Sequence, residues 1–389
     1  MLLCSKQSYN SAQDRIDDSG RAGNSIMKIK QLIREYALAT YYGANGKPGR
    51  LLPVAIRVIR ARLKYGIGPV PFSALNISSA PEATWIDYII KKSTSDSVLL
   101  AINHEDAHRF ARNKVLFYEH CQRAGLPTIP IICRVGGTPD PLGPAVELVK
   151  DAERLSTLLE SAPRRLFAKS IAGSYGAEAF LIAPRNTGFE FDGRTGTATD
   201  LFVYLQQRCD AHTGFVIQPQ MRPHANMLPL ASANGLPTIR VVTSMSADGP
   251  EALFACLKMP VGPSITDNFA HGTGGNLLAG IDLESGTLTC ATGSRRRDWP
   301  VMTHVDCHPD SSVRITGSQV PFWREIVQTA LQGQASLPSF KTIGWDVAAT
   351  PGGVVLVEAN SKYDMDILQI AHQRGLKSEW AAKLHVTID

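Results

Sequence analysis

Two acidic residues and an amide near the carboxyl end of the chain have a spacing that could bind a divalent cation. Residues 344–360 contain two runs of β-forming residues on either side of a Pro-Gly-Gly turn at 351–353, which is typical of a hairpin. If those three residues form the loop, Asp346 pairs with Glu358. Because side chains alternate between the two faces of a strand, Asn360 then shares the face of Glu358.

Two carboxylates opposite each other need a neutralising charge. Like charges directly across a ladder destabilise it, so the pairing of Asp346 with Glu358 predicts a bound cation. Two carboxylates and one carboxamide are hard oxygen ligands of the kind that Mg²⁺ prefers. The alternative is an ordinary solvated hairpin with a polar face. Against it, the four apolar residues 354–357 come just before Glu358 and indicate a buried strand.

A lysine followed by a glycine loop could bind the phosphates of a nucleotide. Lys169 follows the short apolar run 166–168, and the loop residues Gly173, Ser174, Tyr175 and Gly176 come soon after it. A lysine on a strand can place its ammonium on phosphates, and glycines allow backbone N–H groups to approach phosphate oxygens. The same pattern is common in proteins that bind no nucleotide. It is not a Walker A motif, because no Gly-Lys-Ser/Thr ends it.

Two further cations lie beside apolar runs. Arg240 is inside the run 237–243, and Lys258 closes the run 253–257. A buried guanidinium or ammonium needs an anionic partner. That partner is either a structural carboxylate or a phosphate of the substrate. The polar, glycine-rich segment 267–276 could grip phosphate or substrate, or could simply connect two strands.

The elements that would carry these residues are mixed. Helical periodicity predicts helices over 29–42 and 52–63, from an N-cap at Asn103 through Lys114 to about 125, over 323–331 and from about 368. Strands are predicted over 98–102, 127–133, 215–218, 238–245 and 252–258. This order is α+β and argues against a doubly wound dinucleotide-binding fold.

Composition limits the class of protein. A chain of 389 residues with 44% hydrophobic content can form two or three domains. Its net charge is +5 and its basic residues are spread along most of the chain, which argues against a nucleic-acid partner and suits an enzyme that handles phosphates and carboxylates. The seven scattered cysteines contain no CxxC pair. Without a long apolar run or a signal peptide, we expect a cytoplasmic protein with no membrane partner.

Taken together, these segments resemble the ATP-grasp superfamily, most closely its sugar-transfer-associated branch, which is related to α-L-glutamate ligases. The resemblance runs from about residue 98 to 375 and implies an α+β ATP-grasp fold that uses ATP and Mg²⁺. We expect a disordered leader over 1–26, a mostly helical N-terminal domain over 27–110, a lid subdomain over 111–215 and a catalytic subdomain with the metal site over 216–389.

The resemblance also implies roles for individual residues. Lys114 and Lys169 would contact the nucleotide, with Gly173 to Gly176 as the lid loop. The adenine contacts would come from Gln218, Gln220 and Met221, although relatives usually have an acidic residue in this segment. Arg240 and Lys258 would be catalytic residues around the γ-phosphate, and Asp346, Glu358 and Asn360 would be the magnesium ligands.

The function implied is ATP-dependent ligation. A small-molecule carboxylate would be activated as an acyl phosphate with release of ADP, and then captured by an amine, or by a thiol or hydroxyl, with release of phosphate. One alternative is an ATP-grasp kinase that phosphorylates a small molecule without ligation. Another is a nucleotide-binding protein without turnover. A homo-oligomer is compatible with the sequence, which names neither the carboxylate nor its acceptor.

Overall fold

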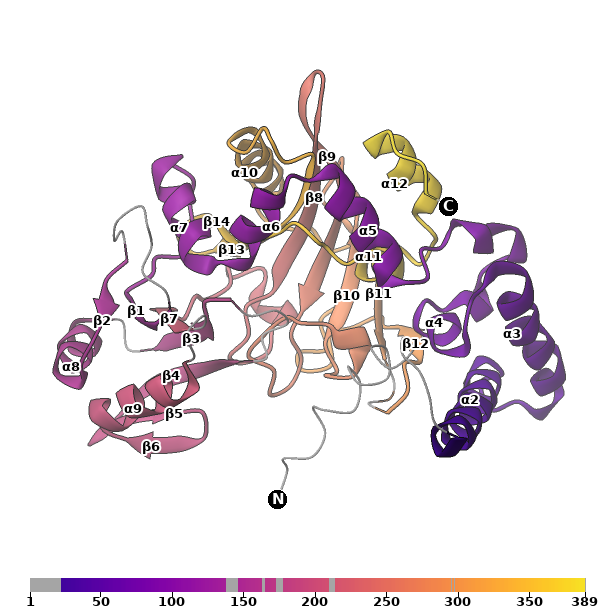
Figure 1. Ribbon diagram of the computed structural model, residues 1–389, viewed down its shortest axis with the longest axis horizontal. Coiled ribbons are helices and arrows are strands. Elements are labelled where there is room, and N and C mark those ends of the chain that lie inside the picture. Colours follow the sequence, from indigo (N-terminus) through magenta and orange to yellow (C-terminus); the bar gives the residue numbers. More distant parts are fainter. Residues whose placement is uncertain are drawn as a thin grey trace. The chain divides into compact units, whose positions relative to one another are not determined.

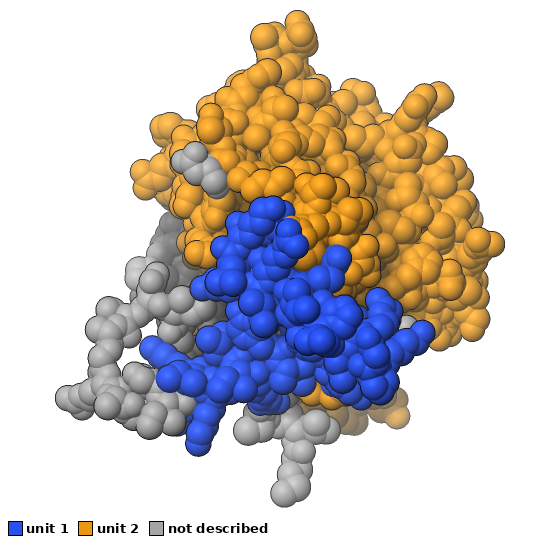
Figure 2. All heavy atoms as spheres, turned by 90° about the vertical axis from the view of Figure 1, so that its right-hand side faces the viewer, with its two compact units in different colours: residues 1–72 blue, residues 73–389 orange. Residues whose placement is uncertain are grey.

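The computed structural model describes residues 22–137, 146–162, 165–172, 178–209, 214–294, 296 and 298–388. The chain divides into two compact units, residues 1–72 and 73–389, which are coloured separately in Figure 2. The predicted lid loop, Gly173 to Gly176, lies outside the described residues. So does most of the predicted leader, of which residues 22–26 are described as helix.

The first unit is helical in its described part. It contains α2 (Ala22–Gly43), the short 3₁₀ helix η2 (Pro48–Arg50), α3 (Leu51–Tyr65) and the start of α4 (Pro69–Ala74). α2 and α3 pack against each other. α3 ends at Gly66, whose left-handed backbone closes the last turn. Both helices predicted for this region are therefore present, and each is longer than its periodicity indicated.

The second unit combines helices with two sheets. Its described helices are η3 (Ile77–Ser79), η4 (Glu82–Asp87), α5 (Lys92–Ile102), α6 (Glu105–Arg112), α7 (Lys114–Arg123), α8 (Ala152–Ser161), α9 (Ala198–Arg208), η5 (Leu228–Leu230), η6 (Ala270–Gly272), α10 (Trp323–Ala335), α11 (Met365–His372) and α12 (Lys377–Leu384). The predicted α+β class is confirmed. None of the described helices combines the length and apolar character needed to cross a membrane.

The first sheet carries Lys169. Its strands lie in the order β2 (Leu148–Val149), β1 (Cys133–Gly136), β7 (Gly214–Pro219), β3 (Leu166–Ser170), β4 (Ala179–Arg185), β5 (Gly188–Phe191) and β6 (Arg194–Gly196). α8 and α9 cover it (Figure 1). Its core includes Leu155 and Leu201 from these helices and Ile217 from β7, all fully buried.

The second sheet carries the other predicted charged residues except Lys114, which lies on α7. Its strands lie in the order β12 (Met302–His304), β11 (Leu288–Ser294), β10 (Leu277–Ile281), β9 (Gly249–Met259), β8 (Thr238–Ser246), β13 (Thr342–Thr350) and β14 (Gly353–Asn360). α10 packs on the four strands β9, β8, β13 and β14. Ile239, Val241 and Trp345 join Ile326 of α10 in one core, which occupies one face of this sheet.

The hairpin of β13 and β14 pairs Asp346 with Glu358 as predicted, although its turn is shorter than predicted. Thr350 pairs with Gly353, so the loop has two residues and not three. With no other change, Val357 would lie opposite Asp346. A bulge shifts the register by one residue just after Asp346 and brings Glu358 into that position.

Three predictions for the segment from residue 98 to residue 133 are wrong. Residues 98–102 belong to α5 and not to a strand. The buried residues Ser95 and Leu99 are four apart, while Leu100 is exposed, so the apolar run has helical period. Asn103 is not the N-cap of the next helix: it is the C-cap of α5, and its side chain binds the backbone of Thr342. The strand predicted over 127–133 begins only at Cys133.

Candidate active site

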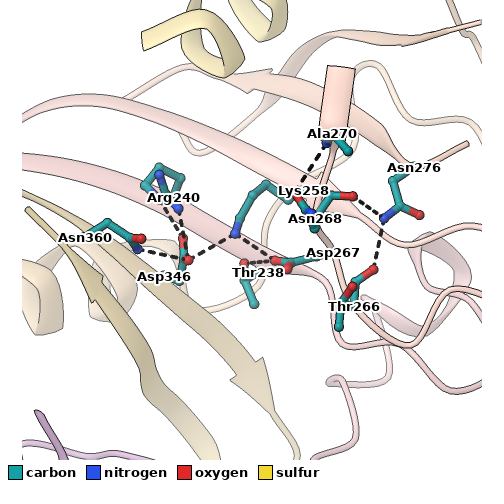
Figure 3. Close-up of polar contacts among 10 residues, drawn as sticks. All are labelled: Thr238, Arg240, Lys258, Thr266, Asp267, Asn268, Ala270, Asn276, Asp346 and Asn360. Atoms are coloured by element: carbon teal, nitrogen blue, oxygen red, sulfur yellow. Dashed lines mark hydrogen bonds and ion pairs between the residues drawn. The ribbon is translucent and has the colours of Figure 1, made fainter. Parts of the chain in front are cut away.

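Asp346 is the centre of a buried cluster of charges on the second sheet. Its side chain is 6% exposed. Arg240 donates from Nε to Oδ1 at 2.6 Å and from its second terminal nitrogen to Oδ2 at 3.1 Å. Lys258 places its ammonium 3.1 Å from Oδ2 (Figure 3). Of the two partners left open for Arg240, the structure therefore contains the structural carboxylate.

Strand alternation produces this cluster. Arg240 pairs directly with Asp346 across β8 and β13. Its neighbours Ile239 and Val241 point into the core beneath α10, so Arg240 projects from the opposite face. Gly344 provides room for it. A Cβ at Gly344 would lie 3.0 Å from Cδ of Arg240 and 2.7 Å from Cβ of Tyr363.

Lys258 has a second carboxylate partner that was absent from the predicted site. Oδ2 of Asp267 lies 3.0 Å from its ammonium, and the hydroxyl of Thr238 donates to the same carboxylate. Asp267 belongs to the glycine-rich loop that follows β9. Asn276 braces this loop by donating to the carbonyls of Thr266 and Asn268 at 2.9 and 2.7 Å (Figure 3). The loop is thus fixed in its described conformation and ion-paired to β9.

These contacts control protonation. Burial alone would raise the pKa of Asp346, but the charges of Arg240 and Lys258 and their hydrogen bonds hold that pKa well below its usual range. Burial likewise works against the charge of Lys258, and the carboxylates of Asp267 and Asp346 outweigh it and raise the pKa of the lysine. Asp346 and Lys258 are therefore both charged at neutral pH.

A second pair of charges lies between α7 and β14. Asn113 caps α7 by accepting from the amides of Val115 and Leu116, which fixes the position of Lys114 in the first turn. The ammonium of Lys114 is 3.6 Å from Oε1 of Glu358. The backbone amide of Lys114 also donates to the carbonyl of Ile171, which follows β3. α7 is thereby tied to the strand that carries Lys169.

Lys169 is the cation contributed by the first sheet. It is half-buried. Its ammonium interacts electrostatically with four charged residues, Glu358, Lys114, Asp346 and Asp267. Burial lowers the pKa of this ammonium to about 8, with Glu358 opposing the shift and Lys114 adding to it. Within the described ranges, no residue forms a hydrogen bond or an ion pair with this ammonium. An anion that binds here would remove the cost of burying the charge.

The three predicted metal ligands lie together, although side-chain cations already neutralise two of them. Oδ2 of Asp346 accepts from Arg240, Lys258 and also Asn360, the last at 3.3 Å. Glu358 has its contact with Lys114 and is 31% exposed. The described part of the chain contains no group of three acidic, histidine or cysteine side chains arranged to hold a metal. The carboxylate of Glu358 and the carbonyl oxygen of Asn360 are hard oxygens suited to Mg²⁺, whereas Asp346 is engaged as a counterion.

The predicted adenine contacts lie at the carboxyl end of β7. Gln218 is buried and donates to the carbonyl of Ile129 at 3.2 Å. Gln220 donates to the carbonyl of Asn234 at 3.1 Å, and Met221 beside it is half-buried. Both glutamine amides are therefore held by backbone groups.

Sequence reasoning recognised the loop at 267–276 but gave none of its residues a role. The signal for Asp267 was its polar, glycine-rich surroundings, which do not specify a partner. A lysine at the end of a buried strand requires an anionic partner, and in this structure the partners are carboxylates. Which carboxylates these are depends on the pairing of β8 with both β9 and β13 and on the path of the loop.

The part of the chain that resembles known proteins lies within the second unit. The family model described as sugar-transfer associated ATP-grasp matches residues 93–384. A search of curated proteins finds no match.

Similar solved structures share little sequence with this chain. An ADP complex of N5-carboxyaminoimidazole ribonucleotide synthetase is 11% identical with a TM-score of 0.39, over 72% of this chain and 53% of that one. This chain thus spans about half the length of that relative. D-alanyl-alanine synthetase A from Vibrio cholerae is 9% identical with a TM-score of 0.43, over 72% and 66% of the two chains. A RimK domain protein from Sphaerobacter thermophilus is 13% identical with a TM-score of 0.36, over 73% and 75%. On the family match, which covers most of the chain and both sheets, this protein belongs to the sugar-transfer-associated ATP-grasp family.

Proposed function

We propose that the protein is an Mg-ATP-dependent ligase that converts a small-molecule carboxylate into an acyl phosphate and transfers the acyl group to an amine. The observation that carries the proposal is the half-buried ammonium of Lys169. It lies within electrostatic reach of the Asp346 cluster and has no anionic partner among the described residues. An anion placed between the two sheets would bind Lys169 together with the cations of the second sheet.

The nucleotide phosphates are the anions best suited to this position. Lys114 and Lys169 would contact the nucleotide, with the loop from Gly173 to Gly176 contributing backbone amides. Arg240 and Lys258 would contact the γ-phosphate. To reach these two cations, the phosphate must compete with the carboxylate of Asp346. Gln218, Gln220 and Met221 would border the adenine. Binding of this kind rests on positioning and charge, so the transfer needs no nucleophilic side chain.

Glu358 and Asn360 would hold Mg²⁺, and Asp346 would join them once phosphates engage Arg240 and Lys258. The ion supplies charge neutralisation for the transferring phosphoryl group. Before any nucleotide binds, Lys114 supplies the positive charge next to Glu358. This lysine therefore offsets the repulsion between the two carboxylates of the hairpin. The predicted repulsion between Asp346 and Glu358 is relieved by side chains in the described structure.

Dependence on a carboxylic acid distinguishes a ligase from a kinase. In the presence of ATP and Mg²⁺, we expect ADP to form only when a suitable acid is supplied, and amino acids, sugar acids and hydroxy acids form the test panel. Matched alcohols, in which a hydroxymethyl group replaces the carboxyl group, are the control panel. ADP formed with alcohols and never with acids would assign the protein as an ATP-grasp kinase. No ADP under any condition would favour a nucleotide-binding protein without turnover.

The low pKa of Lys169 predicts that ATP binding weakens as the pH rises through about 8. In the empty protein this lysine loses its proton near pH 8, and bound phosphate raises its pKa because an anion favours the ammonium. ATP binding above pH 8 must therefore take up a proton, and the affinity falls until the pH reaches the higher pKa of the complex. Calorimetric titration at several pH values measures this slope.

Two variants make the assignment of this pH dependence specific. Lys169→Arg stays charged through about pH 12, so its ATP affinity should stay level across the window. Lys169→Met should bind ATP weakly at every pH, with no change near 8. If Lys169→Arg shows the same loss of affinity as the wild type, the titrating group is another residue and Lys169 does not contact the phosphates.

A further inference from the structure

Large apolar side chains are exposed mainly on the two helices of the first unit. Sixteen such side chains are exposed among the described residues, and ten of them belong to α2 and α3. The other six are scattered over the second unit. Isolated exposed apolar residues are normal, whereas a concentration of them on one element marks a surface that binds something.

The exposed residues of α3 form a stripe. Leu52, Ile56, Ile59 and Leu63 recur at intervals of four, three and four residues, which places them on one side of a helix. Leu52 and Leu63 are 71% and 82% exposed. The buried residues of the same helix, Val54, Val58 and Ala61, occupy a different sector. α3 thus has one apolar face that is buried and a second that is open to solvent.

The same helical spacing recurs on α2, where Ile29, Leu32 and Ile33 are exposed. Basic side chains accompany both stripes. Residues 22–72 contain nine lysines and arginines and a single acidic residue, Glu35, so this segment carries a net charge of +8 while the whole chain carries +5. On α3, Arg60 and Arg62 are exposed and lie about 70–90° to either side of the stripe.

We propose that α2 and α3 bind the surface of an anionic lipid bilayer, in contrast to the expectation from the sequence that the protein has no membrane partner. Helices with an apolar face flanked by arginine and lysine lie in the boundary between headgroups and acyl chains, with the apolar face inserted and the cations on the anionic headgroups. A second copy of this chain fits less well. A symmetric contact through these helices would bring two surfaces of charge +8 together. The proposal concerns the first unit and is independent of the ligase activity.

Vesicle sedimentation of the full chain tests the proposal. We expect the protein to sediment with vesicles of phosphatidylcholine containing about one third phosphatidylglycerol, and to stay in solution with phosphatidylcholine alone or at high salt. Ile56→Ser combined with Ile59→Ser should lower the partition coefficient at least about tenfold, because two apolar side chains no longer insert. Arg60→Gln combined with Arg62→Gln should lower it about fivefold per charge.

The matched control is Leu100→Ser combined with Val203→Ser. These two residues are 48% and 45% exposed, close to the 55% and 49% of Ile56 and Ile59, but they lie in the second unit. This control should sediment like the wild type, and thermal unfolding should be the same for all variants because each change is at the surface. Full binding by the Ile56→Ser, Ile59→Ser variant would overturn the proposal. So would absence of binding to anionic vesicles, or self-association that this variant abolishes without any vesicle binding.

Discussion

Asp346→Asn is expected to destabilise the folded protein by about 3–5 kcal/mol in the absence of any ligand. The carboxylate is buried between Arg240 and Lys258. Among the described residues, its removal leaves the guanidinium without an ion-pair partner and the ammonium with Asp267 alone. A buried cation without its counterion is among the costliest single changes in a protein. The midpoint of urea-induced unfolding measures this loss.

Two comparisons separate lost charge pairing from other effects. Asp248→Asn makes the same chemical change at an exposed position between β8 and β9, and its unfolding midpoint should stay that of the wild type. Adding Arg240→Met to Asp346→Asn removes one of the two cations that have lost their counterion, and should recover part of the stability. An unaltered midpoint for Asp346→Asn would mean that the Asp346 cluster does not stabilise the fold.

Glu358→Gln is expected to fold normally and to lose about 10²–10³-fold in turnover. The side chain is 31% exposed and its one described ion pair, with Lys114, is 3.6 Å long, so loss of its charge should cost much less stability than loss of the Asp346 carboxylate. In the proposed site, however, this carboxylate holds the metal that neutralises the transferring phosphoryl group. Removal of one preorganised charge at such a position typically costs this much in rate.

The rate is measured as carboxylate-dependent ADP release at saturating ATP, and the unfolding midpoint of the same sample reports on folding. Glu251→Gln, on β9 of the same sheet, removes an exposed carboxylate outside the cluster and should keep the wild-type rate. Raising the Mg²⁺ concentration should restore part of the activity of Glu358→Gln, because its ligand set is weakened and not removed. A wild-type rate in this variant would exclude Glu358 from the metal site.

The site could be predicted from sequence where strand alternation alone decides which side chains meet. The apolar runs around Arg240, Lys258 and Asp346 indicated buried strands, and the structure brings these three residues together. The pairing of Asp346 with Glu358 was predicted from a three-residue turn. It arises from a two-residue turn and a bulge, which no local pattern in the hairpin specifies.

Features set by tertiary structure could not be predicted in the same way. The run 98–102 is short and apolar, and such runs fit a helix or a strand until packing selects one. The second partner of Lys258 depends on the path of the loop that carries Asp267. The apolar stripes of α2 and α3 had the period of buried amphipathic helices, and only their exposure distinguishes a surface that binds an outside partner.

The most direct test of the central claim is capture of the acyl phosphate by hydroxylamine. The wild-type protein is supplied with ATP, Mg²⁺ and the carboxylic acid that supports ADP release, with hydroxylamine in place of the native amine. We predict formation of the hydroxamate in step with ADP, because a strong nucleophile attacks the activated acyl group and displaces phosphate. Glu358→Gln should form neither product at a comparable rate. ADP release accompanied by a stable phosphorylated product, and by no hydroxamate, would contradict the account.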